Sequence, residues 1–173
     1  MHLPIKTAMS SRKKLSAVCG IAAIGLTATA LVIGIPALAT PGSGFVPRPQ
    51  SVGSFAPMDV KGDKTGKWDL FLKTKDRSTV GVDLLTVATG GYSGWHTHTG
   101  LTLVTVKQGQ VAVIDGDDCT TKVYQAGEGF VDASNHNHNV TNPYGLTAVL
   151  VAVQIRPLGS SPRVDAPAPP NCP

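Results

Sequence analysis

From about residue 68 onward, apolar and polar side chains alternate over short runs that are separated by Gly, Asn, Asp or Pro. Alternation with a period of two is typical of a strand with one buried face, and these runs are rich in Val, Thr and Leu. The runs predict strands at residues 68–75, 79–88, 95–98, 101–106, 110–115, 121–124, 129–132, 138–141 and 147–155. No convincing helical period follows residue 39. Many short strands at close spacing predict an all-β fold, a sandwich or a barrel.

The chain has 173 residues, and its segments differ in composition. Residues 1–39 begin with Lys and Arg, continue through an apolar run and end in Ala37-Leu38-Ala39, as a cleaved secretory signal does. An uncleaved membrane anchor is the alternative. Residues 40–66 contain much Gly, Pro and Ser and predict an extension or linker, with room for a short edge strand. Residues 67–157 form the predicted barrel, and 158–173 a Pro-rich tail.

Charge argues against two classes of partner. Four of the fifteen Lys and Arg lie in residues 1–39, which leaves eleven to balance the eleven Asp and Glu, all of which follow that segment. Binding to nucleic acid or to an anionic membrane needs a concentrated basic face. We therefore expect no nucleic-acid partner, and membrane attachment only through an uncleaved signal. The leader itself predicts a secreted, extracytoplasmic protein.

Two cysteines follow the leader, Cys119 in a polar turn and Cys172 in the Pro-rich tail. In an oxidising compartment an even pair is most simply a disulfide, which would hold the tail against the domain. Free thiols and an intermolecular bond are the alternatives.

Histidines provide the candidate chemistry. His96 and His98 are one residue apart on a predicted strand, so both side chains point to the same face. His138 lies about forty residues further on, where later strands can fold back toward the pair. Three imidazoles on one site are a common set of ligands for a transition metal. Gly100 then permits a tight turn into the strand that follows, whose residues Thr102, Val104 and Val106 face inward.

The spacing of these residues resembles two motifs of the cupin superfamily. Gly90, His96, His98, Thr102 and Gly109 keep every interval of the first motif, except that Thr102 stands where the family normally has Glu. The second motif is matched by a glycine, a histidine and an asparagine, namely Gly127, His138 and Asn142. The resemblance covers roughly residues 68–157 and implies a single jelly-roll barrel with irregular extensions at both ends. It is specific for the fold, whereas function varies widely among cupins.

The resemblance also implies a metal site made of His96, His98 and His138, without the usual carboxylate. Such a set suits iron, copper, nickel, zinc or manganese, and it favours a small chelating or anionic substrate. Three-His cupins of this kind include dioxygenases. Further candidates for the rim of the barrel or for substrate contact are His136, Tyr92, Trp95 and Tyr124.

Three functions remain open on the sequence. The chain is a metal-dependent enzyme, most plausibly dioxygenase-like, or a non-catalytic secreted module that binds a small ligand or metal, or a metal-free degenerate cupin with a structural role. No catalytic base is evident, because Glu128 and Asp132 are as well explained by a turn that faces solvent. Arg77 and Arg156 are the arginines nearest the motifs. A homodimer is a further expectation from the resemblance.

Overall fold

The computed structural model describes residues 39–172, and the predicted signal lies almost entirely outside them. The described residues contain strands and turns with no helix, and so none long and apolar enough to cross a membrane. The all-β prediction is therefore confirmed for this part of the chain.

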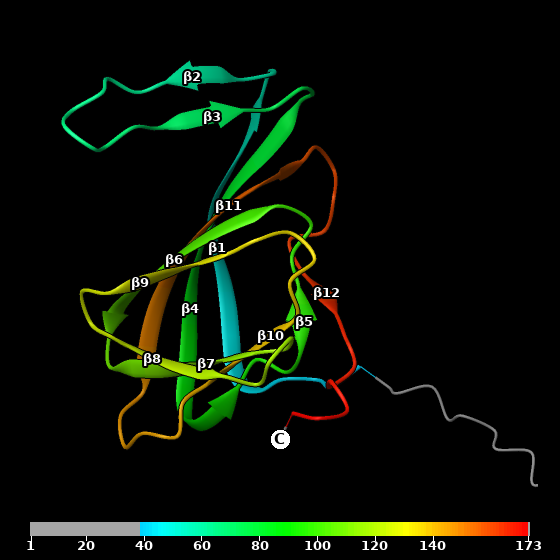
Figure 1. The fold of residues 1–173 in the computed structure, drawn as a ribbon. Coiled ribbons are helices and arrows are strands. Elements are labelled where there is room, and N and C mark those ends of the chain that lie inside the picture. Colours follow the sequence, from blue (N-terminus) through cyan, green and yellow to red (C-terminus); the bar gives the residue numbers. More distant parts are fainter. Residues whose placement is uncertain (1–38, 173) are drawn as a thin grey trace, which may run out of the picture. The chain divides into compact units, whose positions relative to one another are not determined.

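Ten strands form one antiparallel sheet that curls into a nearly closed barrel (Figure 1). They are β1 (Ser43–Phe55), β4 (Ser78–Tyr92), β5 (His96–Thr97), β6 (Leu101–Gln108), β7 (Gln110–Asp115), β8 (Thr121–Gln125), β9 (Gly129–Asp132), β10 (His138–Thr141), β11 (Ala148–Pro157) and β12 (Val164–Asp165). The main path of the sheet runs β12-β5-β10-β4-β11-β6-β9. β1 joins β4, while β7 joins β10 and carries β8. Strands far apart in sequence thereby become neighbours, which brings β5, β9 and β10 to one end of the interior.

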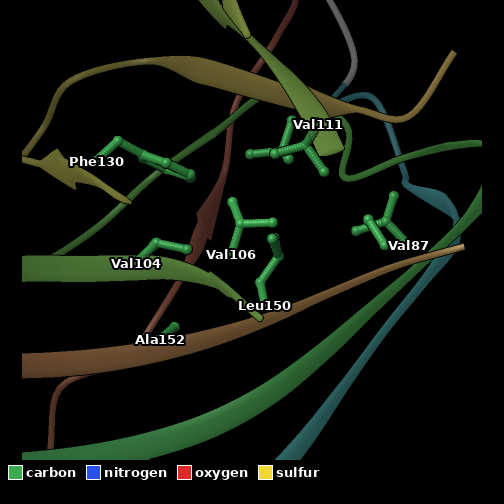
Figure 2. Packing of buried hydrophobic residues seen from close by; sticks show 9 residues of the cluster. Val87, Val104, Val106, Val111, Phe130, Leu150 and Ala152 are labelled. Atoms are coloured by element: carbon green, nitrogen blue, oxygen red, sulfur yellow. The ribbon is translucent and has the colours of Figure 1, made fainter. Parts of the chain in front are cut away.

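The apolar core lies inside this barrel (Figure 2). β6 alternates buried and exposed residues along its first six positions, as the predicted inward parity of Thr102, Val104 and Val106 requires. β11 lies between β4 and β6, and its Leu150 is fully buried. Burial of such side chains is the main favourable term in folding, worth about 1.5 to 3 kcal/mol for each large one.

The segment predicted as an irregular extension differs in the structure. Its first half forms β1, a thirteen-residue strand that pairs with β4 along almost its whole length. The sequence obscures β1 because Pro47 and Pro49 interrupt it and few of its side chains are buried. Proline is tolerated on an edge strand, where a missing N–H removes no ladder bond. β1 is therefore stabilised mainly by backbone pairing with β4 and only slightly by burial of apolar side chains.

The predicted start of the packed domain near Trp68 also differs. Residues around it form a separate two-stranded sheet of β2 (Asp59–Lys61) and β3 (Phe71–Lys73). Trp68 and Phe71 are 58% and 64% exposed, so the apolar residues of this hairpin do not enter the core. The continuous buried pattern begins instead with Ser78 at the start of β4.

Two glycines shape the turns at the two ends of β6. Gly109 joins β6 to β7 with a φ of 73°, in the left-handed region that side chains other than glycine rarely adopt. Gly100 has a different reason to be glycine, because a Cβ there would collide with the carbonyl oxygen of Ile155 on β11. The turn after His98 can therefore pack directly against the neighbouring strand.

Candidate metal site

Three histidines meet at the end of the barrel interior. His96 lies on β5 and pairs directly with His138 on β10, while His98 follows β5 by one residue. All three are buried, with exposures of 4%, 8% and 1% for His96, His98 and His138. One nitrogen from each lies within 4.8 Å of the others. The structure thus brings together the three residues that the spacing singled out.

Backbone carbonyls hold the three rings in the same tautomer. The Nδ1 of His96 lies 2.9 Å from the carbonyl oxygen of Gly94, and that of His138 lies 3.1 Å from the carbonyl oxygen of His136. His98 Nδ1 bonds to the Pro162 carbonyl at 2.8 Å. A carbonyl only accepts, so each Nδ1 carries the proton and each Nε2 is left with a lone pair. This arrangement is the usual one for a metal-binding histidine.

The environment keeps these rings neutral. Burial, together with the neighbouring His138 and Arg163, lowers the pKa of His96 to about 2. Burial likewise lowers the pKa of His138 to about 4 and lowers the pKa of His98. A neutral imidazole is the form that binds a metal, so the rings are ready to act as ligands at neutral pH.

Asp132 adds a carboxylate for which the sequence left a solvent-facing turn and a catalytic role open. The solvent-facing alternative is wrong, because Asp132 is only 4% exposed and lines the cavity inside the barrel. It lies on β9 directly opposite Thr102 in the pairing with β6. Its Oδ2 is 3.3 Å from Nε2 of His138 and 4.0 Å from Nε2 of His98. Burial raises the pKa of Asp132 to about 6.

One buried nitrogen in this cluster lacks a hydrogen bond. His138 Nε2 has no hydrogen-bond partner within the described part of the chain, although the Asp132 carboxylate lies close to it. With the proton on Nδ1, a lone pair of the imidazole faces the oxygen of an ionised carboxylate. A cation between them would satisfy both, and the donor set of three imidazoles and one carboxylate suits a divalent transition metal.

The cluster borders a cavity of about 230 Å³ inside the barrel. Its walls are mostly apolar and include Phe45, Leu85, Val104, Phe130, Val140 and Leu150. The polar lining residues besides the metal cluster are Thr102, Asp83, Gln154 and Arg163. Pockets of this character bind small molecules, with a few polar groups setting their orientation.

The other candidates from the sequence do not line this cavity. His136 lies outside it and bonds through Nε2 to the Asp115 carboxylate at 3.1 Å. Tyr92 is 40% exposed, and Trp95 is buried at 3% exposure. Tyr124 packs on Phe130, with ring centroids 4.9 Å apart. These aromatic residues lie elsewhere because their strands direct them to the outside of the barrel or into packing around it.

The arginine at the cavity is also different from the two that the sequence suggested. Arg77 is exposed and donates to the Ser54 hydroxyl, while Arg156 donates to the Ser160 carbonyl. Arg163, from the tail, lines the cavity. No motif marks it, since it reaches the barrel only when the tail folds back.

The predicted disulfide between Cys119 and Cys172 is present. It holds the end of the tail to the β7–β8 turn, while β12 pairs with β5 beside His96. Both ties follow Pro162 and Arg163 in the chain, and β11 precedes these two residues.

The barrel was compared with known proteins. Its residues 83–154 match the model of the cupin domain family Cupin_2. No curated protein matches the chain significantly.

Solved structures with similar folds are distant in sequence. A cupin domain from Bordetella pertussis Tohama I is 20% identical over 69% of this chain and 99% of its own, with a TM-score of 0.45. An oxalate oxidase in complex with the substrate analogue glycolate is 22% identical over 50% of this chain and 46% of its own, with a TM-score of 0.45. A polyketide cyclase from Streptomyces resistomycificus is 18% identical over 53% and 64%, with a TM-score of 0.44. The family match identifies residues 83–154 as a cupin domain.

Proposed function

We propose that this protein binds a divalent transition metal through Nε2 of His96, His98 and His138. The observation that carries the proposal is the shared orientation of the three rings. Each donates its Nδ1–H to a backbone carbonyl, which leaves the Nε2 lone pair for a metal. One nitrogen of each ring lies within 4.8 Å of the others, and Nε2 of His138 is buried with no hydrogen-bond partner among the described residues. Neutral imidazoles in this arrangement fit iron, copper, nickel, zinc or manganese.

Asp132 would be the fourth ligand. The cupin motif normally has Glu at the position of Thr102, and β9 presents Asp132 directly opposite that threonine. A carboxylate supplied from the next strand would enter nearly the same space as the one that is missing. It would also reduce the net charge of the bound ion, and its negative charge would favour a divalent cation over a metal-free site. Thr102 is therefore a weak argument for a degenerate barrel.

The cavity beside this cluster supports an enzymatic role on a small molecule. A bound ion would supply Lewis-acid and, for iron or copper, redox chemistry at the cavity floor. The residues of the chain would hold the ion, and the apolar walls would exclude water from it. We propose a dioxygenase-like reaction on a small chelating substrate.

We further propose that the protein works outside the cytoplasm. The predicted leader in residues 1–39 supports export, and the Cys119–Cys172 disulfide supports an oxidising compartment. The metal and the disulfide would then be part of the same folded, exported protein.

Metal content tests the first proposal directly. The wild type and a His96→Ala/His98→Ala double variant are purified side by side, loaded with each candidate metal, dialysed and analysed by mass spectrometry. We expect about one ion per wild-type chain and loss of it in the double variant. Arg48→Gln is the matched control, since Arg48 is exposed on β1 and does not line the cavity, so its replacement should leave the metal content unchanged. Equal trace metal in wild type and double variant would reject the site.

Oxygen consumption then tests the reaction. The iron-loaded and copper-loaded proteins are supplied with thiols, diketones and phenolics, and oxygen uptake is compared with that of the double variant. Uptake that needs both the metal and one substrate class supports the enzyme. Full metal loading without uptake for any class would favour the non-catalytic binding module instead.

A further inference from the structure

We propose that the C-terminal tail adds an anion-binding subsite to this cavity, with Arg163 as its cation. The ligand would then be a small carboxylate with an apolar body. This inference rests on the proposed metal site and specifies its substrate class.

Arg163 is held firmly at the cavity wall. β12 begins at the next residue and pairs with β5, so that Val164 lies opposite Thr97 and Asp165 opposite His96. Nη2 of Arg163 donates to the Ser93 carbonyl at 2.8 Å, and Nε donates to the Asp165 carboxylate at 2.6 Å. Among the described residues these two bonds occupy only part of a group that has five N–H donors. The guanidinium is therefore oriented, and donors remain for a ligand.

The segment around Arg163 is coupled to the metal cluster as well. The preceding residue, Pro162, lines the cavity and accepts the Nδ1 proton of His98 through its carbonyl. The positive charge of Arg163 also contributes to the lowered pKa values of all three histidines. Arg163 and the three histidines therefore interact electrostatically around the same cavity.

The charges around the cavity favour an anion once a metal is bound. Asp132 would be engaged by the ion, which leaves Asp83 as the other carboxyl group of the lining. Burial raises the pKa of Asp83, while Arg156 acts against this shift. Asp165 pairs with Nε of Arg163, so a bound metal would supply the main positive charge. The remaining N–H groups of Arg163 would offer a carboxylate the planar donor geometry of a guanidinium.

The other residues that line the cavity determine the size and polarity of the rest of the ligand. They are apolar, and about 230 Å³ lies below the roughly 300 to 1,000 Å³ of pockets for drug-sized ligands. A short aliphatic or single-ring body fits this description, and an extended polar chain does not. The ligand class is thus a small monocarboxylate whose body is apolar.

The subsite is an addition to the shared barrel. The family match ends at residue 154, before Pro162 and Arg163. The tail that carries them is secured by the disulfide at Cys172 and by β12. Anion recognition in this chain would therefore come from a segment outside the conserved domain model.

Cobalt(II) provides a visible probe of ligand binding. The wild type, Arg163→Gln, Arg163→Lys and the control Arg48→Gln are loaded with cobalt(II) and titrated with butyrate or with the neutral butyramide. Arg48 is an exposed residue of β1 that does not line the cavity. Absorption of the cobalt ion reports occupancy of the adjacent cavity.

We expect butyrate to bind the wild type and Arg48→Gln alike, with butyramide at least about tenfold weaker. Arg163→Gln should lose about tenfold in butyrate affinity, the size expected for one hydrogen bond to a charged group. Arg163→Lys should keep part of that affinity, because it keeps the charge. All four proteins should load cobalt equally.

Two failures are distinguishable. Normal cobalt loading with equal butyrate affinity in the wild type and Arg163→Gln, or with no preference for butyrate over butyramide, overturns the subsite and leaves the metal site standing. A wild type that does not load cobalt overturns the metal site and the subsite together.

Discussion

The barrel wall and the C-terminal tail both contribute to the cavity, but they are held in different ways. His138 sits on β10, which pairs with β7 over four residues, and His96 sits on the short strand β5 between β10 and the tail strand β12. The tail residues Pro162 and Arg163 depend on a two-residue strand, a few side-chain bonds and a disulfide. Metal ligands need rigid placement, which the wall supplies. Selectivity for a ligand can be added by a segment that is held by fewer backbone bonds.

The largest effect on stability should come from the wall. Leu150 is fully buried in the core cluster, and Leu150→Ala should lower the free energy of unfolding by about 2 to 5 kcal/mol. The matched control in the tail region is Leu158→Ala, because Leu158 is 48% exposed and should change stability by less than about 0.5 kcal/mol. Urea titrations measure both. Similar losses in the two variants would contradict the distinction between wall and tail.

Removal of the disulfide should have the next largest effect. A Cys119→Ala/Cys172→Ala variant should lose about 2 to 4 kcal/mol of stability, because the unfolded chain is no longer closed into a loop. Its metal content should stay at the wild-type level, since the ligands lie on or beside strands. Its preference for butyrate should decrease as Arg163 becomes less well held. Denaturation and metal analysis on the same sample check this, and a metal-free yet fully folded variant would contradict it.

Acid should destabilise the metal-free protein through the wall histidines. Their pKa values in the folded state are about 2 for His96 and about 4 for His138, below the ordinary 6.5. Below pH 6.5 the unfolded chain therefore binds protons that the folded protein does not, so stability falls as the pH falls. Asp132 acts in the opposite sense between pH 6 and 3.8, because its folded pKa is raised.

Three buried rings oppose one carboxyl group, so on balance the folded state binds fewer protons than the unfolded chain and stability falls between pH 6 and pH 4. Urea titrations at several pH values measure the slope. His96→Gln should reduce it, and stability that stays level on acidification would count against buried neutral rings.

The smallest effect should come from replacing the carboxylate at residue 132, and it tests whether a carboxylate at residue 102 can take its place. Asp132→Asn should weaken metal binding by about 10- to 100-fold without removing it, because three imidazoles remain. Adding Thr102→Glu to that variant should restore much of the affinity, since residue 102 lies directly opposite residue 132. Competition with a chromophoric chelator measures both. An unchanged affinity in Asp132→Asn would exclude the carboxylate from the site.

Parts of this arrangement were predictable from the sequence and parts were not. Period-two alternation and motif spacing identified the all-β barrel and brought His96, His98 and His138 to one location. Asp132 was missed because its position depends on the register between β9 and β6, which alternation within one strand does not specify. The alternation did hold a signal, since Phe130 and Asp132 share a face and the first of them is clearly a core residue.

Two other parts lay beyond local patterns. β1 was obscured because its stability comes from pairing with β4, while its own composition is that of a loop. Arg163 was missed because nothing in the order of the motifs indicates that the tail returns to the cavity. The Cys119 and Cys172 pair indicated that the tail folds back onto the domain, without indicating which residue it would bring to the metal cluster.

The hydrogen bond between His98 and the Pro162 carbonyl links the tail to the histidine cluster. A ligand or metal that stabilises the tail in its position against the barrel must, by thermodynamic reciprocity, bind more tightly when the tail is in that position than when it is detached. External thiols reach the Cys119–Cys172 bond more easily when the tail is detached from the barrel. Occupancy of the cavity should therefore slow reduction of this disulfide. The rate of reduction would then report, from the far end of the tail, whether the barrel is filled.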